Sequence, residues 1–268
     1  MKILFLGDVF GRSARQKVKK ELPAIRRTLN LDFVVVNGEN ATQGKGITPN
    51  HADELIGAGI DCMTLGDHAF DQKTILSHFQ KQPKLLRPLN LGHDLPGKGY
   101  GVYTTKNAKK VLVMAALGQI FMKKPYDNPI RFVNEVLSRY PMGAGKAVDA
   151  IIVDFHCEAT SEKMIAGRLW DSQVSLVAGT HTHIPTADAR VLPNGTGFIT
   201  DAGMCGDYDS VIGMESQVPM DRFAKGYSAN QMRPAVNEAT LCGVLVETDD
   251  NTGLAIRIEQ FIQGAQIG

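Results

Sequence analysis

Short, mostly apolar runs alternate with segments of helical periodicity along the first part of the chain. The runs at residues 3–6, 33–36 and 62–65 are typical of strands that are covered on both faces. Between and after them, apolar residues recur at three- and four-residue spacings, which indicates helices. These helices are expected at residues 14–29, 51–58 and 72–79. The resulting β-α-β-α-β order predicts a mostly parallel sheet.

The same pattern continues to the end of the chain. Strands are expected at residues 100–105, 111–117, 151–153 and 174–178, and helices at 132–137 and from about Thr160. The last two expected strands, 241–247 and 254–262, are joined by the turn-rich segment D-D-N-T-G, which predicts an antiparallel hairpin. Because neither a linker nor a repeat interrupts this order, we expect one domain spanning residues 1–268.

Two features of the helical segments leave alternatives open. Pro23 lies inside the first expected helix and predicts a kink or a division into two helices. One face of that helix carries six basic residues, which favours a solvated surface over a nucleic-acid-binding face. They are Arg15, Lys17, Lys19, Lys20, Arg26 and Arg27.

Composition narrows the class of protein. The chain has 29 basic and 28 acidic residues and a formal net charge of +1, so we expect no strong electrostatic binding of nucleic acid. Apolar runs stay well below the roughly 18 residues of a membrane span, so no membrane association is expected. The four cysteines are scattered without a C-x-x-C pair, which indicates reduced thiols and a cytoplasmic protein.

Polar residues with ligand chemistry follow five of the expected strands. They are Asp8, Glu39, Asn40, Asp67, His68, His156, His181 and His183. Each has an ordinary explanation by itself, since an aspartate after a strand is often a helix cap and a lone histidine is often structural. Together they point to one site, because the carboxyl ends of parallel strands meet at one crevice.

The donor set indicates a metal centre. Oxygen and nitrogen donors without a thiolate suit iron, manganese or zinc. The donors are too many for one ion, which favours two ions that share a bridging carboxylate. The sequence lacks a Walker P-loop, a G-x-G-x-x-G fingerprint and a G-x-S-x-G elbow, so it gives no support to a P-loop protein, a dinucleotide-binding enzyme or a serine hydrolase.

The order of these motifs resembles that of the dinuclear calcineurin-like metallophosphoesterases. Their order is G-D-x, an acidic residue after the second strand, G-[ND]-H, a single histidine and G-x-H-x-H. The segments at residues 37–41, 154–163, 179–188 and 200–204 resemble more narrowly the YmdB-type branch. The resemblance extends from residue 1 to about residue 262.

This resemblance implies a four-layer α/β/β/α sandwich of two mixed sheets flanked by helices. It also implies hydrolysis of 2′,3′-cyclic nucleotides, or of RNA ends that carry a cyclic phosphate. One ion would be held by Asp8, Glu39, Asn40 and His183, and the other by Glu39, Asp67, His156 and His181. Glu39 would bridge the ions, and His68 would be the general acid. The family more often has asparagine where this chain has Asp67, so the chain carries one more negative charge there.

The expected chemistry is attack on phosphorus by a hydroxide held between two ions, iron or manganese first and zinc as an alternative. His68 would protonate the leaving oxygen, because an imidazole titrates near neutral pH. Asp71 would either orient that ring or cap a helix. The loop at residues 204–210 would rim the site, with Tyr208 either stacked on a base or purely structural.

Alternative functions remain open at this stage. A phosphomonoesterase or nucleotidase could use the same metal centre, and a regulatory scaffold could use it only to sense a nucleotide. The partner that we expect is a small nucleotide or an RNA end, and a homo-oligomer remains open.

Overall fold

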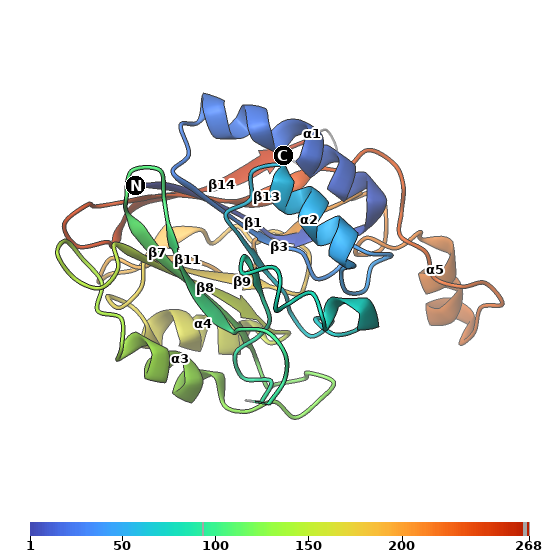
Figure 1. Cartoon of the computed structure of the whole chain (residues 1–268). Helices are drawn as coiled ribbons and strands as arrows, with labels where there is room; N and C mark the ends of the chain where they lie inside the picture. The colour runs from blue at the N-terminus through green and yellow to red at the C-terminus, as the bar shows by residue number, and fades with distance from the viewer. Residues whose placement is uncertain (93, 265–266, 268) are drawn as a thin grey trace.

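The first six-stranded sheet brings both ends of the chain together. The computed structural model describes residues 1–92, 94–264 and 267, and Figure 1 shows its layers. The strand order of this sheet is β14-β13-β1-β3-β4-β5. Its strands are β1 (Lys2–Leu6), β3 (Phe33–Asn37), β4 (Cys62–Thr64), β5 (Leu85–Leu86), β13 (Leu241–Thr248) and β14 (Ala255–Gln263). The strands β1, β3, β4 and β5 run parallel, whereas β13 is antiparallel to both β1 and β14, as the predicted hairpin requires.

The second six-stranded sheet has the order β10-β11-β9-β8-β7-β6. Its strands are β6 (Tyr100–Thr104), β7 (Lys110–Leu117), β8 (Ala150–His156), β9 (Leu176–Thr180), β10 (Arg190–Val191) and β11 (Gly197–Ile199). The inner strands are parallel, and the edge strands β6 and β10 are antiparallel to their neighbours. A separate two-stranded ladder pairs β2 (Asp8–Val9) with β12 (Met204–Cys205).

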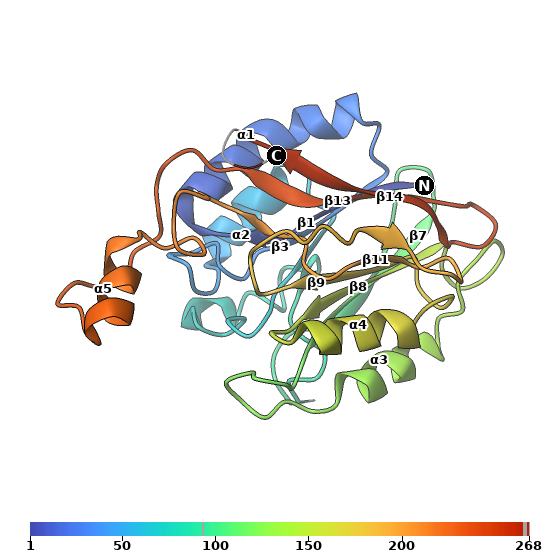
Figure 2. The same cartoon turned by 180° about the vertical axis from the view of Figure 1, so that it is seen from behind.

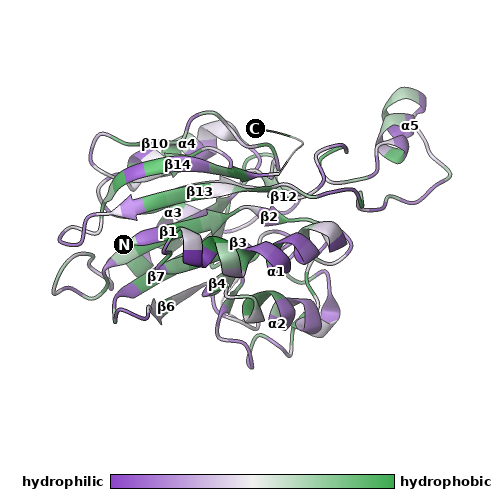
Figure 3. Ribbon diagram, turned by 90° about the horizontal axis from the view of Figure 1, so that it is seen from above, coloured by the Kyte–Doolittle hydropathy of each residue, from purple (hydrophilic) through white to green (hydrophobic). Residues whose placement is uncertain are grey.

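Helices cover the outer face of each sheet. Figures 1 and 2 show α1 (Gly11–Thr28) and α2 (Pro49–Gly57) on the first sheet, and α3 (Pro129–Leu137) and α4 (Thr160–Leu169) on the second. The predicted four-layer α/β/β/α sandwich is therefore confirmed. The outward side of α1 is largely hydrophilic, and α5 (Gln217–Lys225) lies at the end of an extended loop, away from both sheets (Figure 3). None of the helices in the described ranges is both long and apolar enough to cross a membrane.

Alternating side chains of β1 explain why its apolar run is unbroken. Leu4 and Leu6 pack in the core formed with α1 and α2, whereas Ile3 and Phe5 pack in the core between the two sheets. A strand that is buried on both faces needs apolar residues at every position. Trp170 belongs to a third core, beneath α3 and α4.

One local expectation does not hold, and one of the two alternatives for Pro23 is excluded. Residues 72–79 form only a short 3-10 helix (Lys73–Ile75) and turns, because an α-helix of eight residues has little stability of its own. Ile75 and Phe79 are buried without it. Pro23 does not divide α1, which is one helix. Its ring frees the carbonyl of Lys19, and Lys19 lies on the exposed side, where water can bind that carbonyl.

Candidate metal centre

The carboxyl ends of strands from both sheets meet at one end of the sandwich. The first sheet supplies residues that follow β1, β3 and β4, and the second supplies residues at the ends of β8 and β9. Ligand atoms of Glu39, Asp67, His156 and His181 all lie within 4.8 Å of one another. These four residues, which we call the cluster, are the set expected for the second ion.

The carboxylate oxygens and imidazole nitrogens of the cluster lie close to one another. Nε2 of His156 lies 3.1 Å from Oε1 of Glu39 and 3.4 Å from Oδ1 of Asp67. Nδ1 of His181 lies 3.0 Å from Nε2 of His156 and 3.6 Å from Oδ1 of Asp67. Asp8 adjoins the cluster, with its Oδ1 3.8 Å from Nδ1 of His156.

Buried oxygens without a hydrogen-bond partner test whether these residues fit a metal. Three of the five such oxygens in the described residues are Oδ1 of Asp8, Oδ1 of Asn40 and Oδ1 of Asp67, and the other two are the hydroxyl oxygens of Ser13 and Thr240. A buried polar atom left unpaired costs about 1–3 kcal/mol, so each needs an explanation. All three belong to predicted ligands. The side-chain nitrogen of Asn40 donates to the Gly44 carbonyl, 3.0 Å away, which leaves the side-chain oxygen available for an ion. Cations bound in the two expected ligand sets would satisfy all three oxygens, so the donor set fits a metal centre.

The electrostatics favour positive charge at this point. Burial lowers the pKa of His156, but the Glu39 and Asp67 carboxylates outweigh burial and hold that pKa well above its usual value. Burial raises the pKa of Asp67, but the neighbouring His156 brings it below its usual range. Burial and the neighbouring charge of His156 lower the pKa of His181 to about 4. The carboxylates therefore stabilise a cation here, as a metal ion requires.

A buried hydrogen-bond network fixes the ring of His156. Thr180 donates its hydroxyl to Oδ1 of Asp154 at 2.7 Å, so it accepts from Nδ1 of His156 at 2.8 Å. The other oxygen of Asp154 accepts from Asn37 at 2.9 Å and from Thr64 at 2.5 Å. Because Nδ1 is engaged by Thr180, Nε2 is the nitrogen that faces the cluster, and it would give its lone pair to an ion that displaces its proton.

The loop that carries both other histidines is held by a buried ion pair. Nζ of Lys163 lies 2.8 Å from Oδ2 of Asp201, and both side chains are fully buried. The same oxygen accepts from the backbone N–H and the hydroxyl of Thr182, at 3.1 and 2.6 Å. Thr182 stands between His181 and His183, whose φ angles are +94° and +67°. Asp201 thus holds an otherwise unfavourable loop in place.

His68 lies beside the cluster rather than in it. Its Nδ1 is 2.8 Å from Oδ2 of Asp71, and its backbone N–H donates to Oε2 of Glu39 at 3.3 Å. Asp71 contacts this ring, and the short helix that follows begins after Gln72, whose side chain makes no capping bond. Of the two roles open to Asp71, the geometry favours orienting the ring.

A sequence profile described as YmdB-like protein matches residues 4–261. The chain belongs to this YmdB-like family. A 2′,3′-cyclic-nucleotide 2′-phosphodiesterase of Bacillus subtilis is 39% identical over 98% of this chain and 97% of its own length. A hypothetical protein of Thermus thermophilus and a novel phosphatase of Mycoplasma pneumoniae have similar structures. Each has a TM-score of 0.88 and 35% sequence identity, and each alignment covers 98% of this chain. The alignments cover 98% of the Thermus thermophilus protein and 92% of the Mycoplasma pneumoniae phosphatase.

A more distant structure supports the fold alone. The sulfate thiohydrolase SoxB of Thermus thermophilus aligns over 95% of this chain and 43% of its own, at 13% identity and a TM-score of 0.54. The sandwich is therefore shared beyond the YmdB-like family.

Several residues at this YmdB-like site were not singled out by the sequence analysis. A Cβ atom at Gly66 would lie 2.0 Å from Oε2 of Glu39 and 2.4 Å from Nε2 of His156, so only glycine fits between β4 and the cluster. Oε2 of Glu158 lies 3.3 Å from Nε2 of His181. The only signal for Gly66 and Glu158 was that they lie inside the motifs shared with the family.

Tyr208 has a structural position in this YmdB-like protein. Its hydroxyl is 2.9 Å from both the backbone nitrogen and the carbonyl oxygen of Met204, and 3.2 Å from the carbonyl oxygen of His183. Tyr208 is also not among the residues that line the cavity at the cluster. Of the two roles expected for Tyr208, the structural one holds.

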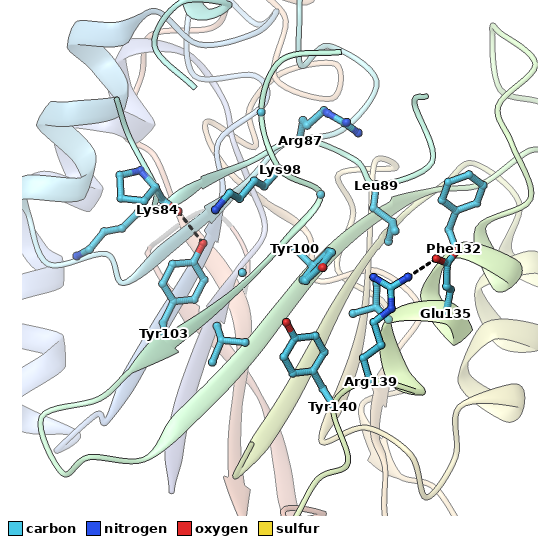
Figure 4. Close-up of a pocket in the computed structure, with 16 residues that line it drawn as sticks. Lys84, Arg87, Leu89, Lys98, Tyr100, Tyr103, Phe132, Glu135, Arg139 and Tyr140 are labelled. Atoms are coloured by element: carbon cyan, nitrogen blue, oxygen red, sulfur yellow. Dashed lines mark hydrogen bonds and ion pairs between the residues drawn. The ribbon is translucent and has the colours of Figure 1, made fainter. Parts of the chain in front are cut away.

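A cavity of about 510 Å³ opens at the cluster of this YmdB-like protein. Its lining includes Glu39, Asn40, His68, His181 and His183, so the expected ligands of both ions and the proposed acid face one space. Nδ1 of His183 donates to the carbonyl of Ile212 at 2.9 Å, which leaves Nε2 for a ligand bond. A larger hollow of about 820 Å³, lined by residues of β6 and α3, lies elsewhere (Figure 4).

Proposed function

We propose that this chain, acting as a single domain of residues 1–268, is a metal-dependent phosphodiesterase. Its proposed substrates are 2′,3′-cyclic nucleotides, free or at the end of an RNA. The observation that carries the proposal is the buried cluster of two carboxylates and two imidazoles, which adjoins His68 at a cavity. The full-length similarity to a 2′,3′-cyclic-nucleotide 2′-phosphodiesterase supports the choice of substrate.

The proposed centre holds two ions in the ligand sets expected from the family. Asp8, Glu39, Asn40 and His183 would hold one ion, and Glu39, Asp67, His156 and His181 the other. Iron or manganese is the first choice and zinc the alternative, because the donors are oxygen and imidazole nitrogen. When bound, such ions neutralise phosphate charge and make hydroxide available near neutral pH.

The side chains of the cavity have complementary proposed roles. Lys45 and Lys123 line it and attract the anionic phosphate. Asp71 engages Nδ1 of His68, so Nε2 of His68 gives its proton to the leaving oxygen. Cleavage of the bond from phosphorus to the 2′ oxygen then adds one water and leaves a 3′-phosphate and a free 2′-hydroxyl.

The cysteines support the proposed cytoplasmic location. Cys62, Cys157, Cys205 and Cys242 are free and buried. Reduced thiols of this kind are typical of a reducing compartment.

Assays of one preparation on three substrates test the proposed activity. After loading with manganese or iron, the protein should hydrolyse 2′,3′-cyclic AMP faster than bis(p-nitrophenyl) phosphate and faster than 3′-AMP. Glu39→Gln is the matched control, because it keeps the size of the side chain and removes the central negative charge. Preferred hydrolysis of 3′-AMP would support a phosphomonoesterase instead. Tight binding of 2′,3′-cyclic AMP by fully loaded protein, without turnover, would support the nucleotide-sensing scaffold.

A further inference from the structure

The lining of the cavity at the cluster has two chemically different parts. One part consists of the predicted ligands and His68. The other part includes six apolar residues, which we call the apolar wall. They are Phe10, Val211, Ile212, Met214, Pro219 and Met232. None of these six side chains offers an oxygen or nitrogen atom for hydrogen bonding.

Much of the apolar wall faces water. Ile212 exposes 53% of its surface, Met232 41% and Val211 36%. Exposed apolar surface gathered beside a buried charged centre is unfavourable in water and marks a place where a ligand binds. We therefore expect the apolar wall to contact a flat or apolar part of a ligand that binds in the same cavity as the phosphate.

Part of the apolar wall is held in place beside His183. The carbonyl of Ile212 accepts the hydrogen bond from His183 at 2.9 Å, and the ring of Phe10 meets His183 edge-on at 5.4 Å between centroids. The backbones of Val211 and Met214 are hydrogen-bonded to each other in both directions, at 2.9 and 3.0 Å. Ile212 has φ +46°, a strained conformation for a β-branched residue, and such strain gathers at functional sites.

We propose that the apolar wall binds the nucleoside of the substrate while the phosphate lies at the cluster. This inference rests on the proposed function. The side chains of the apolar wall can pack against the face of a base, but they cannot form hydrogen bonds with the atoms at its edge. They therefore bind a base without distinguishing which base it is. All four bases should therefore be accepted, with purines favoured modestly for their larger rings.

Two methionines of the same segment provide a matched test. Met232 lines the cavity, whereas Met220 is outside its lining, on α5, and exposes 53% of its surface. The two substrates are 2′,3′-cyclic AMP and ethylene phosphate, which has the same five-membered cyclic diester without a nucleoside. The measured quantity is the ratio of kcat/KM for the nucleotide to kcat/KM for ethylene phosphate.

Met232→Ala should lower this ratio roughly three- to tenfold, mainly through a higher KM for the nucleotide, whereas Met220→Ala should leave it unchanged. Ile212→Ala should act like Met232→Ala. An equal effect of Met232→Ala on both substrates, or no effect, would overturn the proposal. So would a preference above about 100-fold among the four 2′,3′-cyclic nucleotides, which requires hydrogen-bonded recognition. If metal-loaded wild-type protein hydrolyses neither cyclic diester, the proposed function itself is wrong.

Discussion

Replacing Lys163 with methionine should weaken the fold and the metal centre together. The Lys163 side chain is fully buried, and its ammonium lies 2.8 Å from Asp201 and 3.2 Å from the hydroxyl of Thr182. Methionine keeps most of the volume but leaves the carboxylate of Asp201 buried without its countercharge. The loop between His181 and His183 then loses part of its anchor, because Asp201 also holds Thr182.

The size of the effect follows from burial. Removing one partner of a fully buried ion pair costs about 3–5 kcal/mol. The entropy of unfolding is about 2.1 cal/mol/K per residue, so over 268 residues this cost lowers Tm by about 5–9 °C. Loss of a group that positions metal ligands typically lowers metal affinity about 10–100-fold. Both losses are expected in Lys163→Met.

Thermal unfolding and metal titration below Tm measure the two losses separately. Arg168→Met is the matched control, since Arg168 is an exposed cation on the same helix. The double variant Lys163→Met/Asp201→Asn should recover part of the stability, because no uncompensated charge remains. A Tm for Lys163→Met within about 1 °C of the wild type, far below the shift that a buried pair requires, would refute the reasoning. A double variant as unstable as the sum of the two singles would refute the pairing.

Three further predictions concern the site. Elemental analysis should find about two ions per chain; a reproducible value of one or fewer after adding manganese or iron would contradict the two-ion centre. His68→Ala should lower turnover about 10²–10⁴-fold with metal content nearly unchanged, and the loss should shrink for a nitrophenyl ester, whose leaving group needs no proton. An equal loss on both esters would argue against the general acid. Burial raises the pKa of Asp67, but neighbouring histidines bring it below its usual range, so Asp67 stays ionised at neutral pH despite its burial. Asp67→Asn therefore removes a negative charge and should move the alkaline-going limb of the pH–rate profile to lower pH with the same metal; superimposable profiles, or a shift to higher pH, would disprove this.

Much of the fold was predictable because strands buried on both faces leave a strong signal. The apolar runs at β1, β3, β7 and β8 are unbroken, and the polar residues that follow such strands must lie at a sheet edge. The short strands β2, β5, β10, β11 and β12 could not be predicted from periodicity, since most have only two residues. Their positions depend on neighbours that are distant in sequence.

The candidate residues were found by their type and place, but their arrangement needed the structure. Parallel strand order predicted one crevice, whereas the donors come from two sheets whose edges meet. The roles of Asp154 and Lys163 depend on contacts with residues far along the chain, so local sequence patterns could not reveal them. Tyr208 shows the opposite case, in which an aromatic residue near the site is engaged by backbone groups that only the fold brings close.

Because the donors come from both sheets, a bound ion would act as a reversible cross-link between them. An ion at the cluster would join Glu39 and Asp67, which follow strands of one sheet, to His156 and His181, which lie at the ends of strands of the other. Separating the sheets would release the ion, so binding and folding are thermodynamically linked. Once the free ion exceeds its Kd, each further tenfold increase adds about 1.4 kcal/mol to the free energy of unfolding. The resistance of this protein to heat and to proteases should therefore vary with the metal supply around it.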